Sequence, residues 1–100
     1  MIRFTRKGTL KNATLAPKAI GWATELNSYV NEKYDVELHF GIEMFNQLNM
    51  TWYMDFDNLG DVEAFNGQLM MDQDYWTQID KAADFWVDGS LRDTIVNLFA

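Results

Sequence analysis

The sequence contains no cysteine and only one histidine. Without cysteine, the chain forms no disulfide, offers no thiolate for catalysis and builds no zinc site on sulfur. A single histidine excludes a metal site of two histidines and one carboxylate within one chain. No apolar run approaches the ~20 residues of a transmembrane helix, so we expect no membrane span. The N-terminal residues lack the apolar core of a signal peptide, and we therefore expect a cytoplasmic protein.

Several catalytic and binding motifs are also missing. The chain has no glycine-rich phosphate loop, no dinucleotide fingerprint and no Ser-His-Asp order. Residues 55–61 resemble the opening of a calcium loop, but Leu59 occupies a ligand position and Asn66 stands where a bidentate glutamate is needed. Asp57 and Asp61 are better explained as acids at a helix N-terminus. We expect neither a metal ion nor a cofactor.

Basic residues are few, with 8 Lys and Arg against 15 Asp and Glu, and the net charge is −7. Residues 1–33 carry most of the basic groups, whereas residues 34–100 carry most of the acidic ones. Nucleic acid binding requires a basic face, so we expect no nucleic acid partner. Four basic residues form either an anion-binding edge or, more commonly, serve solubility and charge balance within the chain: Arg3, Arg6, Lys7 and Lys11.

Apolar and aromatic residues are abundant. They make up 48% and 15% of the 100 residues, which is typical of one globular domain spanning residues 1–100. So small a core cannot easily bury this many large side chains. We therefore expect the surplus at a subunit interface or in a ligand cavity.

Alternation of apolar and polar residues predicts a β-hairpin in the middle of the chain. Its two arms have apolar residues at every second position, and the polar Asn46-Gln47 separates them. The apolar positions are Val36, Leu38, Phe40 and Ile42 in one arm and Met50, Trp52, Met54 and Phe56 in the other. We expect two further strands, over residues 2–9 and 91–99.

Helical spacing predicts a helix before the hairpin, with Pro17 in its first turn and its end near Tyr34. Its apolar stripe consists of Ala16, Ala19, Ile20, Ala23, Leu26 and Val30. A second helical region begins near residues 57–61, is interrupted at residues 72–74 and stops at residues 88–90. The order is β-α-β-β-α-β, an α+β arrangement.

This order resembles the dimeric α+β barrel superfamily of ferredoxin-like chains, and its NIPSNAP-like branch in particular. In that branch, aromatic-Asp-Ser-Leu ends the hairpin, and Asp-Pro-x-aromatic follows an acidic helix. The corresponding segments here are Phe56-Asp57-Asn58-Leu59 and Asp72-Gln73-Asp74-Tyr75, with Asn for Ser and Gln for Pro. The closing segment, residues 89–94, is also similar. These motifs are helix caps and packing anchors, and they transfer no catalytic residue.

The resemblance implies an antiparallel sheet with helices on one face, paired with a second copy into a dimeric barrel. The superfamily includes cofactor-free monooxygenases of antibiotic biosynthesis, muconolactone isomerases, haem-handling enzymes and proteins without known activity. Fold alone does not choose among these functions. In the haem-handling members of the superfamily, the haem ligand is usually a histidine on a helix. No helix expected here carries a histidine.

His39 is the main candidate for catalysis, because histidine is the side chain most often used as a general base. It belongs to the polar set of its strand, and Tyr53 and Asp55 belong to the polar set of the facing strand. A histidine beside a carboxylate and a phenol is a reasonable general base for a small substrate. The alternative is that these residues are only the polar face of a strand.

Two functional hypotheses follow. In the first, the protein binds a small aromatic or apolar molecule between sheet and helices, with cofactor-independent monooxygenase-like or isomerase-like chemistry. His39, Tyr53 and Asp55 would then be catalytic, and Phe4, Phe65 and Trp76 would form the pocket walls. In the second, the protein is a non-catalytic dimerisation or accessory protein whose aromatics serve the core and the interface.

Overall fold

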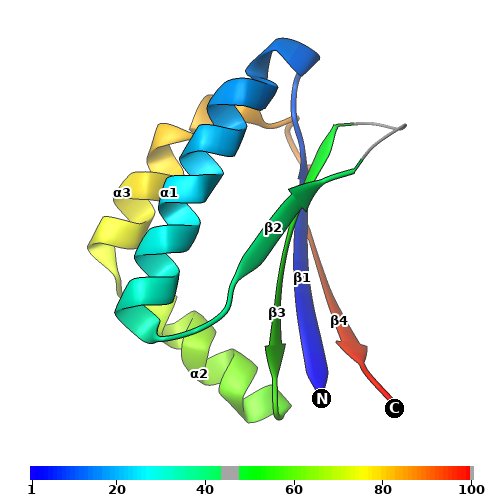
Figure 1. Ribbon diagram of the computed structural model, residues 1–100, viewed down its shortest axis with the longest axis vertical. Coiled ribbons are helices and arrows are strands. Elements are labelled where there is room, and N and C mark those ends of the chain that lie inside the picture. The colour runs from blue at the N-terminus through cyan, green and yellow to red at the C-terminus, as the bar shows by residue number, and fades with distance from the viewer. Residues whose placement is uncertain (44–47, 100) are drawn as a thin grey trace.

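A four-stranded sheet and a layer of helices make up the computed structural model, which describes residues 1–43 and 48–99 (Figure 1). The elements are β1 (Ile2–Thr9), α1 (Ala16–Tyr34), β2 (His39–Ile42), β3 (Asn49–Phe56), α2 (Leu59–Met70), α3 (Gln73–Lys81) and β4 (Arg92–Asn97). Single 3-10 turns precede α1 and follow α3. The predicted order of strands and helices is confirmed, including the division of the second helical region.

The strands lie in the order β2-β3-β1-β4, and each neighbouring pair is antiparallel. The helices cover one face of this sheet and leave the other face bare, which we call the open face (Figure 1). Arg6 on β1 lies opposite Trp52 on β3 and Asp93 on β4, so these three side chains share the helix-facing side. The predicted ferredoxin-like α+β fold is confirmed.

The strand β2 is shorter than the apolar alternation predicted. It begins only at His39, because side chains of α1 hold the backbone just before it. Asn31 accepts a hydrogen bond from the Leu38 amide at 2.7 Å, and the side-chain amides of Asn27 and Asn31 donate to the Leu38 carbonyl at 3.0 and 3.2 Å. These bonds satisfy the backbone amide and carbonyl of Leu38, which a longer β2 would use to bond to the neighbouring strand. The turn predicted at Asn46-Gln47 lies outside the described residues.

Helix α1 has Pro17 in its first turn and ends at Tyr34, as predicted. Asp35, with a φ of 52°, ends the helix in the left-handed conformation. One position of the predicted apolar stripe differs, because Ile20 is 43% exposed. Asn27 is buried instead, where its side chain bonds to Leu38 and to the indole of Trp52.

The helices α2 and α3 each begin at a side-chain cap. Asn58 accepts a hydrogen bond from the Asp61 amide at 2.9 Å, and Asp72 accepts one from the Tyr75 amide at 3.0 Å. Such caps satisfy amides that have no partner within the helix. The two motifs behind the resemblance therefore act as helix caps, as expected.

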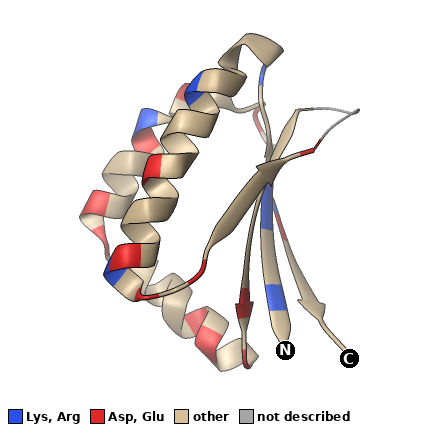
Figure 2. Cartoon of the chain, in the orientation of Figure 1, with Lys and Arg blue, Asp and Glu red and all other residues tan. Residues whose placement is uncertain are grey.

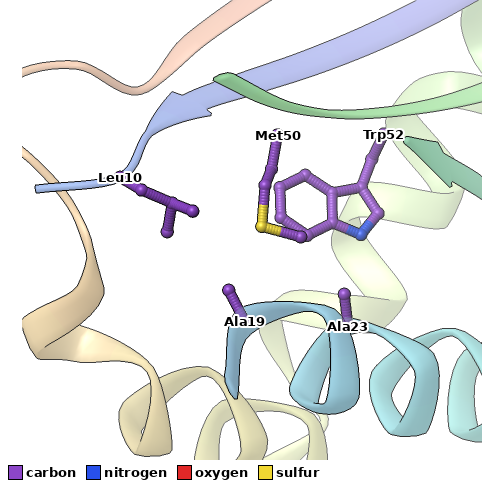
Figure 3. Close-up of a cluster of buried hydrophobic side chains, with 5 residues drawn as sticks. All are labelled: Leu10, Ala19, Ala23, Met50 and Trp52. Atoms are coloured by element: carbon purple, nitrogen blue, oxygen red, sulfur yellow. The ribbon is translucent and has the colours of Figure 1, made fainter. Parts of the chain in front are cut away.

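The main core cluster joins α1 to the centre of the sheet. Leu10, Met50 and Trp52 point from the sheet toward Ala19 and Ala23 on α1 (Figure 3). The two alanines have no exposed surface, and their small side chains let the helix approach the sheet closely. A second buried cluster is formed by Leu26, Val30 and Tyr75.

Charge is distributed unevenly over the fold. The helices carry both acidic and basic positions, whereas the charged positions of β1 are all basic (Figure 2). Among the described residues, no helix is both long enough and apolar enough to cross a membrane.

Candidate ligand cavity

A cavity of about 350 Å³ lies between the sheet and the helices. Both layers contribute aromatic side chains to its lining, so most of its walls are apolar. These aromatic residues are Phe4, Trp22, Trp52, Phe56, Phe65, Tyr75, Trp76 and Trp86. The volume falls in the range of ~300–1,000 Å³ that is usual for small-molecule pockets. Part of the aromatic surplus of the sequence is therefore accounted for.

The alternation of the central strands creates the floor of the cavity. Every second side chain of β1 and β3 points toward the helices, which brings Phe4, Arg6, Trp52 and Met54 to the same side. Gly8 has the same orientation, and a β-carbon there would lie 3.2 Å from Cε3 of Trp86. The glycine therefore lets the chain after α3 lie close against the sheet.

Three tryptophans form a rigid corner of the cavity. The ring centroids of Trp22, Trp52 and Trp86 are 5.9 Å apart in each pair, in edge-to-face contacts. The indole N–H of Trp22 donates to the Gln78 carbonyl at 2.6 Å, and that of Trp52 donates to Asn27 at 3.2 Å. Because protein groups accept both of these hydrogen bonds, the rings of Trp22 and Trp52 present only apolar surface to a ligand.

Arg6 interrupts the apolar lining and is held in an ion pair from outside it. Nε and Nη2 of Arg6 donate to the two carboxylate oxygens of Asp93 at 2.7 and 2.9 Å. The same guanidinium carbon lies 5.5 Å from the ring centre of Phe4. Asp93 is the main cause that raises the pKa of Arg6 above its ordinary value. A two-bond pair of this kind fixes the orientation of the guanidinium.

Tyr75 is the buried polar neighbour of this pair. Its side chain is part of the second core cluster and also lines the cavity. Burial raises the pKa of its hydroxyl, while the positive charge of Arg6 opposes that rise. The hydroxyl is therefore neutral at pH 7 and can donate or accept a hydrogen bond.

The structure divides the predicted site residues between the two faces of the sheet. Phe4, Phe65 and Trp76 come together around the cavity, where they were expected as walls. His39, Tyr53 and Asp55 are absent from the cavity lining. Residues of one strand alternate between its faces, so the polar set lies on the open face and the apolar set faces the helices. The single pocket expected from the sequence is therefore not formed within one chain.

On the open face, the imidazole of His39 stacks on the ring of Tyr53, with 5.0 Å between the ring centres. Asp55 is held by Arg3, whose Nε and Nη2 donate to its oxygens at 2.8 and 3.0 Å. This guanidinium lowers the pKa of Asp55 and also lies 4.6 Å from the ring centre of Tyr53. His39 and Tyr53 are thus adjacent, whereas the carboxylate of Asp55 is occupied. The catalytic role of the three residues stays a prediction.

Sequence reasoning missed Arg6 and Tyr75 as cavity groups and Asp93 as the partner of Arg6. A signal for Arg6 was present, because it belongs to the same alternating set as Phe4 and Gly8 and is charged within an otherwise apolar face. Asp93 offered no such signal, since its pairing depends on how β4 lies against β1. Arg3, Arg6 and Lys7 all pair with acids of the same chain, which agrees with internal charge balance for these three.

Comparison with solved structures finds the same fold in proteins of low sequence identity. A NIPSNAP domain protein from Burkholderia xenovorans aligns with a TM-score of 0.83 and 12% identity, covering 100% of this chain and 96% of that one. A NIPSNAP family protein of unknown function from Agrobacterium tumefaciens aligns with a TM-score of 0.80 and 17% identity, covering 96% and 86%. The resemblance in fold is confirmed.

An antibiotic biosynthesis monooxygenase has the same fold as well. It aligns with a TM-score of 0.73 and 3% identity, covering 100% of both chains. No protein-family model matches the sequence, and no curated protein matches it. Within the described residues, no three histidine, aspartate or glutamate side chains gather as metal ligands.

Proposed function

We propose that this protein binds a small, largely apolar molecule in the cavity between its sheet and its helices. The observation that carries the proposal is the cavity itself, with about 350 Å³ of space and eight aromatic side chains in its lining. Burial of apolar ligand surface against such walls stabilises a complex by roughly 25 cal/mol per Å². The similarity in fold to an antibiotic biosynthesis monooxygenase is compatible with this role and assigns no reaction.

The alternative, a purely accessory protein, is less well supported. An accessory protein needs aromatic side chains only for its core and its interface, and a filled core leaves few voids larger than a water molecule. Here the space lies under the helices and contains the polar groups of Arg6 and Tyr75. A cavity of this size with an oriented polar group is typical of a ligand site.

Native mass spectrometry of gently purified protein, followed by binding of an apolar naphthalene probe, tests the proposal. Ala83 lines the cavity, and Ala83→Trp should fill part of it and weaken probe binding at least about 10-fold, as overpacking of a cavity does. Ala64→Trp on the exposed side of α2 is the matched control and should bind like the wild type. Absence of both a co-purified ligand and probe binding would show that the cavity is not a binding site.

We further propose that the protein acts as a homodimer, with the open face of one copy against that of another. Support comes from the bare sheet face, where Tyr53 and Val96 are only partly covered (Figure 1). A sheet with one uncovered face gains stability by packing face to face with a second sheet. This arrangement would also enclose His39 and Tyr53.

Cofactor-independent chemistry of the monooxygenase or isomerase type is proposed for that enclosed face. His39 would act as the base, and Tyr53 is its adjacent partner, since Arg3 already occupies Asp55. His39→Ala should then abolish turnover and leave the affinity of the cavity for an apolar probe unchanged. Full turnover by His39→Ala would remove His39 from the mechanism.

A further inference from the structure

Arg6 is the one cationic residue among the described residues that line the cavity. Its Nε and Nη2 donate to Asp93, so the pair with Asp93 does not use the N–H groups of Nη1. The hydroxyl of Tyr75 lies near the same guanidinium. The cavity therefore offers hydrogen-bond donors at one place and apolar surface over most of the remaining wall.

The charge at this place is already balanced. Asp93 pairs with Arg6 through two bonds from outside the lining, and Asp88 is a carboxylate within the lining. An ionised carboxylate in an apolar cavity requires a positive charge that is not already compensated. A neutral oxygen acceptor needs no uncompensated positive charge. It still forms a stronger hydrogen bond with a charged donor than with a neutral one.

We propose that the cavity selects neutral apolar molecules with one oxygen acceptor, such as a ketone, and discriminates against carboxylates. Arg6 supplies the donor, and Asp93 sets the charge preference by compensating Arg6. This inference rests on the proposed function, because it specifies the ligand class of the same cavity. Arg6 is in this sense a specificity-determining residue, and Asp93 is a positioning residue that acts through it.

Three probes of similar shape, compared by equilibrium dialysis, separate the effect of an oxygen acceptor on binding from the effect of a negative charge. They are acetylnaphthalene with a neutral carbonyl, ethylnaphthalene with no acceptor and naphthoate with a carboxylate. The wild type should bind acetylnaphthalene about 10-fold more tightly than ethylnaphthalene, as expected for one added hydrogen bond to a charged donor. Naphthoate should bind more weakly than acetylnaphthalene.

Variants of the pair should change the order of the probes. Arg6→Met should remove the advantage of acetylnaphthalene and retain ethylnaphthalene binding. Asp93→Asn should release the charge of Arg6 and raise naphthoate affinity about 10-fold or more, so that naphthoate equals or exceeds acetylnaphthalene. Asp55→Asn is the matched control, because it changes the equivalent pair with Arg3 on the open face and should leave the order unchanged.

The outcomes distinguish this inference from the proposed function. If no probe binds, both are overturned. If all three probes bind equally and Arg6→Met changes nothing, the cavity is a ligand site and the inference alone is wrong. Circular dichroism checks that each variant is folded. If a variant does not fold, the order in which the wild type binds the three probes decides whether the cavity prefers a neutral acceptor.

Discussion

Gly8 shows how a single residue shapes the cavity. It lies on the helix-facing side of β1, and the indole of Trp86 rests against its backbone. A β-carbon at this position would be 3.2 Å from the indole, closer than normal packing allows. Trp86 in turn contacts Trp22 and Trp52, so displacement of its ring would disturb the whole tryptophan corner.

Gly8→Val should therefore destabilise the protein by about 1–3 kcal/mol, the usual cost of overpacking. Gly41→Val is the matched control, because Gly41 is also in a strand and nothing lies within 4 Å of its added β-carbon. A valine in open space on a strand should be neutral within about 0.5 kcal/mol or slightly stabilising. Urea unfolding measures both free energies. Equal effects of the two substitutions would contradict the role of Gly8 as a contact surface for Trp86.

At the scale of elements, Asp72 ties the end of α1 to the start of α3. Its carboxylate accepts hydrogen bonds from the hydroxyls of Tyr29 and Tyr34 at 2.8 and 2.6 Å, and from Nζ of Lys33 at 3.0 Å. It also caps α3 through the amide of Tyr75. Only 2% of its side chain is exposed. Two helices, α1 and α3, thus depend on one buried charge that is fully hydrogen-bonded.

Asp72→Asn should cost about 2–4 kcal/mol of unfolding free energy, because it removes the buried charge and leaves several donors poorly paired. Asp80→Asn, at an exposed position of α3, should change stability by less than about 0.5 kcal/mol. Thermal and urea unfolding compare the two. An Asp72→Asn protein as stable as the Asp80→Asn protein would show that the buried network contributes nothing.

The same carboxylate predicts a pH dependence. Hydrogen bonds from Tyr34, Tyr75, Tyr29 and Lys33 outweigh the cost of burial and hold the pKa of Asp72 well below its ordinary value of 3.8. A group with a lowered folded pKa contributes stability above its unfolded pKa and loses it as the pH falls. The wild type should therefore lose stability on acidification below about pH 4 more steeply than Asp72→Asn. Parallel curves of unfolding free energy against pH for the two proteins would argue against this.

At the scale of the whole molecule, the proposed homodimer places the open faces of two sheets against each other. Thr5 lies at the centre of this face, opposite Tyr53 on one side and Thr94 on the other. Thr5→Lys should dissociate the proposed homodimer, because it places like charges against each other at the middle of the interface. Thr24→Lys on the exposed surface of α1 should not. Native mass spectrometry counts the subunits, and a wild-type monomer would end the barrel proposal.

Local sequence patterns predicted most of the helices and strands correctly. Particular residues show where such patterns fail. The spacing around Pro17 and Tyr34 placed α1 correctly, since a helix records its buried face in its own residues. The start of β2 was missed, because Asn27 and Asn31 on another element hold Leu38. Alternation describes one strand at a time and carries no information about side chains that reach it from elsewhere.

The sequence by itself determined the class of this protein. The alternating hairpin, the two helical regions and the caps at Asn58 and Asp72 suffice for an α+β fold, because each depends on neighbours in the chain. Only the tertiary structure decided which residues share a site. It paired Arg6 with Asp93, 87 positions away, and separated His39 from Phe65 by the thickness of the sheet. Those outcomes depend on which strands lie side by side and which face the helices cover, and no local spacing contains that information.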